Sequence, residues 1–143
     1  MQKIGMQGDG ELAYYYSVRL LIRHPTLLVR EVSEALGMEP HHYWNAGERD
    51  FTQSMMWSLT SWTEGKRLFF DEIYDVLLWL QEKQDFVSHM RASGGDLQII
   101  VQLPGAINIG DTLSLDALPL AAKLGVSIGV EVFPNLVKPA SDE

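Results

Sequence analysis

Residues 63–83 contain the strongest helical pattern of the chain, and they constrain its fold more than any other segment. Apolar side chains recur there at the spacing of one helix face. That stripe comprises Phe69, Ile73, Val76, Leu77 and Leu80. The carboxylates of Asp71 and Glu72 fall outside it, which is typical of a solvated surface. The segment therefore predicts an amphipathic helix whose apolar stripe packs on another layer.

The segments before and after this helix alternate between strand and helix patterns. Runs of β-branched and aromatic residues predict strands over residues 14–22, 42–44, 54–62, 97–103 and 126–133. Helical spacing predicts further helices over residues 24–37, 85–91 and 116–125. Pro25 suits the first turn of the first of these helices, and Gly37 ends it. Asp116 is expected to cap the last one and Gly125 to end it.

The order of these elements predicts the fold class. The chain of 143 residues has the length of one ordinary domain. The order β-α-β-β-α-β followed by α-β indicates an α+β fold, in which a ferredoxin-like βαββαβ core is extended by a C-terminal αβ unit. We expect a mostly antiparallel sheet with the helices on one face. The expected organisation is a flexible N-terminus over residues 1–12, a single α+β domain over residues 13–133 and a tail over residues 134–143.

The acidic charge of the chain argues against some classes of partner. The formal net charge is −8, with 11 Lys and Arg residues, whereas binding to a phosphate backbone requires clustered cations. We therefore expect neither nucleic acid nor membrane as a partner. The longest apolar run, residues 76–80, is too short to cross a bilayer. The first residues lack the apolar stretch of a signal peptide, and the absence of cysteine fits a cytoplasmic location.

The segment GMEPHHYWNAGER, residues 37–49, concentrates groups that can bind metal or move protons. His41 and His42 are adjacent, so in an extended segment they point to opposite faces and do not readily chelate one ion. No helical His pair, thiol or G-x-S-x-G motif accompanies them. We therefore expect no metal site, no cofactor and no catalytic residue in this chain.

Two interpretations of the same segment remain open. In the structural one, Gly37 and Pro40 end a helix and Trp44 anchors the following turn by burying its ring. In the functional one, Trp44, Glu48 and Arg49 form a polar and aromatic lip at the end of the sheet. Glycine, proline and tryptophan have sufficient local explanations here, which favours the structural interpretation.

The sheet face away from the helices is a second candidate surface. Alternation along the strands places aromatic, amide, hydroxyl and charged side chains on it. The expected members are Tyr15, Ser17, Arg19, Met56, Ser58, Thr60, Trp62, Gln98, Ile100, Gln102, Ser127, Glu131 and Phe133. Such a mixture supplies contact area and orientation for a ligand or a protein. Alternatively, this face forms a homodimer or is covered by the third helix. From the face and the lip together, the expected binding residues are Tyr15, Arg19, Trp44, Glu48, Arg49, Trp62, Gln98 and Glu131.

Four stretches of the sequence carry a family resemblance. They are YYYSVRLLI, EVSEALGMEP leading to YWNAGER, MMWSL, and LPLAAKLG running into VSIGVEVF. In this order, over roughly residues 13–133, they resemble a bacterial family named domain of unknown function 4279. The shared landmarks are Leu36, Gly37, Pro40, Trp44, Gly47 and Trp57, five of them in the spacings L-G-x-x-P and W-x-x-G. The resemblance implies a small bacterial cytoplasmic protein, similar to single-domain immunity or interaction proteins, and it brings no catalytic residue to these positions.

Our leading functional hypothesis is a non-catalytic binding or protein-interaction module. A first alternative is a small-molecule-binding domain or a small enzyme with its site beside residues 41–49, where His41, His42, Glu48 and Arg49 would be the acid–base candidates. A second alternative is an immunity-type protein that neutralises a toxin, since an acidic charge suits a basic partner. The expected partner is thus a protein, a small molecule, or a second copy of the chain bound through the open sheet face.

Overall fold

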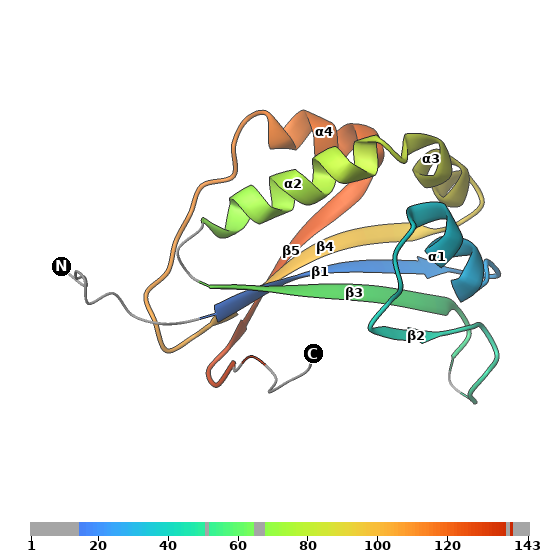
Figure 1. Cartoon of the computed structure of the whole chain (residues 1–143), viewed down its shortest axis with the longest axis horizontal. Helices are drawn as coiled ribbons and strands as arrows, with labels where there is room; N and C mark the ends of the chain where they lie inside the picture. The colour runs from blue at the N-terminus through green and yellow to red at the C-terminus, as the bar shows by residue number, and fades with distance from the viewer. Residues whose placement is uncertain (1–14, 51, 65–67, 137, 139–143) are drawn as a thin grey trace.

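The computed structural model describes residues 15–50, 52–64, 68–136 and 138. These residues form an α+β fold with a five-stranded, mostly antiparallel sheet and four helices, as expected from the sequence (Figure 1). The elements are β1 (Tyr15–His24), α1 (Val29–Leu36), β2 (His42–Trp44), β3 (Met55–Glu64), α2 (Phe69–Gln81), α3 (Gln84–Ala92), β4 (Asp96–Pro104), α4 (Ala117–Leu124) and β5 (Val126–Phe133). The strand order is β2-β3-β1-β4-β5, and of the neighbouring pairs only β4 and β5 run parallel.

The four described helices all lie on one face of the sheet (Figure 1), and the main hydrophobic core fills the space between the two layers. Tyr16 from β1, Trp57 from β3 and Ile73 from α2 are fully buried in it. Burial of such large apolar surfaces is the dominant favourable term in folding. The indole N–H of Trp57 also donates a buried hydrogen bond of 3.0 Å to the hydroxyl of Ser33, which fixes α1 on β3.

The first helix begins later than the sequence pattern indicates. α1 starts at Val29, so Pro25 does not lie in its first turn as expected. The side chain of His24 provides the reason. Its Nδ1 accepts hydrogen bonds from the backbone N–H groups two and three residues along the chain, at 3.0 and 2.9 Å. These bonds hold the chain in a turn before the helix, which then begins with the buried Val29.

The last helix begins directly after Asp116, as expected, but without the expected cap. Asp116 makes no side-chain cap. The Ala117 N–H instead donates to the hydroxyl oxygen and the carbonyl of Ser114, at 3.3 and 3.1 Å. Both glycine stops are as expected, because Gly37 and Gly125 adopt left-handed conformations with φ of 70° and 72° directly after α1 and α4.

The face of the sheet away from the helices is called here the open face. In the β1–β3 register Leu20 pairs with Leu59 on the helix side, and the next pair, Arg19 with Thr60, belongs to the open face. Neither α3 nor α4 covers this face, because both lie on the other side of the sheet (Figure 1). A second, smaller group of apolar side chains lies there, separate from the main core. It consists of Leu21, Met56 and Ile100, with Trp44 packed against them.

Candidate binding site

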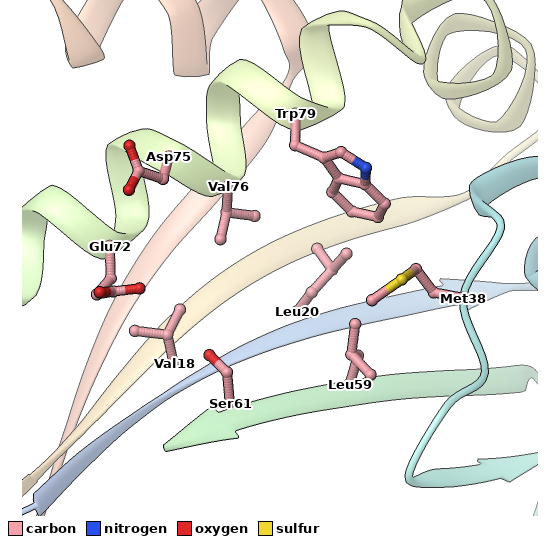
Figure 2. A pocket seen from close by; sticks show the side chains of 9 residues that line it. All are labelled: Val18, Leu20, Met38, Leu59, Ser61, Glu72, Asp75, Val76 and Trp79. Atoms are coloured by element: carbon pink, nitrogen blue, oxygen red, sulfur yellow. The ribbon is translucent and has the colours of Figure 1, made fainter. Parts of the chain in front are cut away.

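A cleft of about 300 Å³ opens between α2 and the helix-facing side of β1 and β3 (Figure 2). We call it the α2–β3 cleft. Its lining residues are Val18, Leu20, Met38, Leu59, Ser61, Glu72, Asp75, Val76 and Trp79. The volume falls at the lower end of the range for small-molecule sites, about 300 to 1,000 Å³. The cleft is therefore large enough for a small ligand.

Two neighbouring strands form the floor of the α2–β3 cleft. Leu20 is paired with Leu59 across β1 and β3, and Val18 is paired with Ser61. Alternation along the strands turns all four side chains toward the helices. Val18 and Leu20 are buried, Leu59 is half-buried and Ser61 is exposed. The floor is thus apolar except at the end where Ser61 lies.

The wall of the cleft is one side of α2. Asp75, Val76 and Trp79 follow Glu72 by three, four and seven positions, which places these four side chains along one side of the helix. This side adjoins the buried stripe of the same helix. Val76, expected in that stripe, is half-buried and contributes to the wall.

The cleft is polar at one end and apolar at the other. Figure 2 shows Glu72 and Asp75 at one end, and Met38 and Trp79 at the other. Met38 comes from the connection after α1 and is 42% exposed. Carboxylates accept hydrogen bonds and attract cations, whereas the thioether and the indole offer apolar contact. This arrangement suits a ligand with an apolar body and a cationic end.

The expected lip at residues 44–49 is held together by its own contacts. The carboxylate of Glu48 accepts hydrogen bonds from the backbone N–H and the side-chain amide of Asn45, at 2.9 and 3.1 Å, and these bonds lower the pKa of Glu48. The Trp44 indole donates to the carbonyl of Ser54 at 2.9 Å. The guanidinium of Arg49 lies 5.9 Å from the centre of the Trp44 ring. These contacts order the connection between β2 and β3.

A second hollow, of about 380 Å³, lies beside the lip between α1 and β2, with Tyr43 and Glu48 among its lining residues. The histidines do not line it. His41 accepts a hydrogen bond of 2.9 Å from the backbone N–H of Thr60 through Nδ1, and His42 is exposed on β2. Of the four acid–base candidates, only Glu48 reaches this hollow.

The other expected binding residues lie on the open face, away from the cleft. They are Tyr15, Arg19, Trp62, Gln98 and Glu131. Gln102 links two neighbours across three strands, because it accepts a hydrogen bond of 2.6 Å from Ser17 and donates one of 2.9 Å to Glu131. Within the part of the chain that the structure describes, Arg19 Nε and Ser58 Oγ are buried without a hydrogen-bond partner. Binding by this face stays a prediction.

In residues 15–50, 52–64, 68–136 and 138, no three His, Cys, Asp or Glu side chains gather closely enough to hold a metal ion. No helix within these ranges is long and apolar enough to cross a membrane. Among the residues lining the α2–β3 cleft, the titratable ones are Glu72 and Asp75.

Comparison with known proteins identifies the family of the chain. The model of the family described as "Domain of unknown function (DUF4279)" matches residues 13–134. The chain belongs to the DUF4279 family. This confirms the resemblance found in the sequence. No curated protein and no solved structure matches the chain.

The landmarks of the DUF4279 resemblance occupy framework positions in this structure. Leu36 and Trp57 are buried in the core. Gly37 and Gly47 adopt positive φ values of 70° and 82° at turns. Trp44 packs against the apolar cluster of the open face. These roles support the structural interpretation of residues 37–49 in this DUF4279 protein.

Sequence reasoning misses the α2–β3 cleft of this DUF4279 protein. It assigns Glu72 to a solvated face and Val76 to the core, and it does not single out Trp79. One signal was present: Trp79 follows Val76 by three positions and Glu72 by seven, so all three side chains lie along one edge of the apolar stripe, to which Val76 belongs. These side chains border a cleft only because of the way α1 and α2 are placed on the sheet. No local sequence pattern indicates that placement.

Proposed function

We propose that this protein is a non-catalytic binding domain whose α2–β3 cleft takes a small amphipathic molecule with an apolar body and a cationic group. The observation that carries this proposal is the polarity of the cleft, in which an apolar floor ends beside two carboxylates. The size of the cleft, its apolar lining and its charge each support one part of the proposal.

The apolar body of the ligand fits the floor and the far end of the cleft. Leu20, Leu59 and Val76 present aliphatic surface, and Trp79 adds the face of an indole ring. Met38 contributes a flexible thioether that adapts to different shapes. Burial of ligand surface here is worth roughly 25 cal/mol per Å² of apolar area. Most of the affinity is therefore expected from this end.

The carboxylates of Glu72 and Asp75 supply the selectivity. They are three residues apart on α2, so both flank the same end of the cleft. A cation is attracted to this end and an anion is repelled. Glu72 is half-buried and Asp75 is exposed, so each contact is expected to be worth only about 0.2 to 1 kcal/mol in water.

The lining of the cleft suits binding better than reaction. Ser61 is the hydroxyl among the lining residues, and among the described residues no histidine or lysine lines the cleft to activate it as a nucleophile. The carboxylates lie at the rim rather than in an enclosed, water-free site. This composition supports recognition of a ligand without covalent chemistry.

Three probes with the same alkyl chain test this proposal: octylammonium, octanol and octanoate. Octylammonium is expected to bind about threefold to tenfold more tightly than octanol, because the two carboxylates attract its charge and do not attract a neutral hydroxyl to the same degree. Octanoate is expected to bind most weakly. Isothermal titration calorimetry measures all three dissociation constants.

Substitutions in the cleft distinguish the contribution of its carboxylate end from that of its apolar floor. Replacing Glu72 with Gln and Asp75 with Asn is expected to reduce octylammonium binding to the level of octanol. Asp71→Asn is the matched control, because Asp71 is exposed on the same helix and does not line the cleft. Leu59→Trp fills the floor and is expected to weaken all three probes. Binding that is equal for the three probes and unaffected by Leu59→Trp would contradict the proposal.

A second candidate function is a protein-interaction module that uses the open face. It is favoured by Arg19, which is half-buried on the open face and whose Nε has no hydrogen-bond partner among the described residues, since a partner carboxylate would pair with the accessible part of this guanidinium. A partner retained on the immobilised protein is then expected to be lost with Arg19→Met and kept with Arg30→Met, which alters an exposed arginine on α1. Two outcomes would argue against this function: the Arg19 variant retains that partner, or the wild type retains no partner at all.

We also propose an assignment for the detailed topology of the fold. We infer that β1, α1, β2, β3, α2 and β4 form a ferredoxin-like unit and that α4 and β5 extend it. The strand order β2-β3-β1-β4 with antiparallel neighbours supports this assignment. The parallel addition of β5 beside β4 supports the added unit.

A further inference from the structure

β5 is an edge strand whose outer side has no strand partner among the described residues. It runs for eight residues and pairs with β4 along its whole length on the other side. Proteins usually protect such edges with lysine, proline, bulges or a covering segment. β5 contains no lysine or proline, and Glu131 is its one charged residue. Its Val130 and Val132 are 54% and 61% exposed, so none of the described segments covers them.

The sequence of β5 has an internal symmetry that an antiparallel pairing would use. Around Gly129, the order Val-Ser-Ile-Gly-Val-Glu-Val repeats the same types of side chain in both directions. Apolar residues flank the glycine, polar residues come next, and valines end the run. A strand with this symmetry is complementary to a second copy of itself, as a two-fold interface requires.

We propose that two copies of this chain form a homodimer in which their β5 strands pair antiparallel about Gly129, joining the two sheets edge to edge. Val126 of one copy would then face Val132 of the other, and Ile128 would face Val130. Ser127 would face Glu131, and each Gly129 would face its equivalent. This interface lies at the edge of the sheet and leaves the open face free, unlike the dimer expected from the sequence.

The cross-strand pairs that involve side chains are favourable. Val126, Ile128, Val130 and Val132 alternate onto one side of β5, so the joined sheet gains a continuous row of apolar contacts there. On the other side, one carboxylate oxygen of Glu131 accepts from Gln102 at 2.9 Å. Its second oxygen can accept a hydrogen bond from the Ser127 hydroxyl of the second copy.

Other registers are less favourable. Moving the centre of symmetry by two residues, to Glu131, would place two like charges directly opposite each other, which is destabilising. Sliding one strand by a single position would place apolar residues opposite polar ones. The valines of the two copies would then lie on opposite sides of the joined sheet. The side chains therefore select the register centred on Gly129.

A single cysteine tests both the contact and its register. The chain has no native cysteine, and a Cβ added at Gly129 would make only ordinary contact with Ile100, at 3.5 Å. Directly opposed residues of antiparallel strands have Cα atoms about 4.5 to 5.5 Å apart, which a disulfide can bridge. Gly129→Cys is therefore expected to form a covalent dimer on mild oxidation.

Variants at Ser127 and Glu131 supply the matched controls. Ser127→Cys alone is expected to stay unlinked, because its equivalent in the second copy lies four positions away, roughly 13 Å along the strand. A mixture of Ser127→Cys and Glu131→Cys is expected to link as a heterodimer. Linking of Ser127→Cys alone, with none of Gly129→Cys, would overturn the proposed register.

Sedimentation velocity measures the dimer without crosslinking. The wild type is expected to shift from monomer to dimer as its concentration rises, and added salt to favour the dimer by screening the charge of −8 on each copy. Val130→Lys is expected to weaken dimerisation at least tenfold. Leu115→Lys, at a position 82% exposed outside β5, is expected to leave it unchanged. A wild type that stays monomeric at high protein concentration, with Gly129→Cys unlinked, would refute the dimer.

Discussion

Gly95→Ala is expected to destabilise the fold by about 1 to 3 kcal/mol, the usual cost of forcing an extra methyl group into a packed site. A Cβ at this position would lie 2.8 Å from the carbonyl oxygen of Met90 and 2.9 Å from Cδ2 of His24, besides meeting the Met90 sulfur. The carbonyl cannot easily move away, because it accepts the hydrogen bond from the Gly95 N–H that closes the turn after α3.

Urea unfolding measures this effect through the midpoint of the transition. Gly110→Ala is the control, because a Cβ added there meets nothing within 4 Å and its backbone needs no positive φ. That variant is expected to match the wild type closely. An unchanged midpoint for Gly95→Ala would show that the α3–β4 turn relaxes far more freely than its contacts indicate.

The second large effect concerns pH. The stability of the protein is expected to fall as pH is lowered from about 7.5 to about 5.5, the range in which histidine titrates, because of His24. Its Nδ1 accepts two backbone N–H groups, and its Nε2 lies 2.8 Å from the hydroxyl of Ser93. This arrangement requires a neutral ring with the proton on Nε2. A proton on Nδ1 would point at two donors.

The direction of the pH effect follows from the pKa of His24. Burial, together with the charge of His89, lowers this pKa below its ordinary value of 6.5, against a smaller opposing effect of Glu31. The unfolded chain therefore takes up a proton before the folded protein does. The contribution of His24 is fully present above pH 6.5 and is lost as pH falls toward the lowered pKa. Each unit of lowering corresponds to about 1.36 kcal/mol.

His24→Asn is the informative variant, because its amide oxygen can replace Nδ1 as an acceptor but does not titrate. The free energy of unfolding of this variant, measured in urea at both pH values, is expected to change less with pH than that of the wild type. His42→Asn, at an exposed position on β2, is expected to keep the full dependence. A wild type that is equally stable at both pH values would contradict this account of His24.

The strands of this fold could be predicted well because β-branched and aromatic residues concentrate in them. β5 was expected at residues 126–133 and lies there, and β2 was expected at residues 42–44. The starts of helices were less predictable. Pro25 is an acceptable first-turn residue, but the His24 side chain already uses the next N–H groups. Asp116 is a good capping residue, but its own backbone is helical, with φ of −71° and ψ of −29°, and the Ala117 N–H finds its acceptors on Ser114.

The candidate site was harder to predict than the fold. Faces of strands follow from alternation, so Arg19 and Glu131 could be placed on the open face from the sequence alone. The α2–β3 cleft instead depends on surface that remains between packed elements. Trp79 looks like an ordinary amphipathic residue until Met38, forty-one positions earlier in the chain, is found at the same cavity. Such a juxtaposition is set by tertiary packing and has no local sequence signal.

Met38 also determines how broad the ligand range of the cleft can be. The other apolar lining residues belong to strands or to a helix, whereas Met38 stands on a connection and has an unbranched side chain. Rotation about its bonds would lengthen or shorten the apolar end without moving the backbone. Ligands whose tails differ in shape would then fit the same cleft, whereas Glu72 and Asp75 lie on the helix α2 and would distinguish ligands by the charge of their head group.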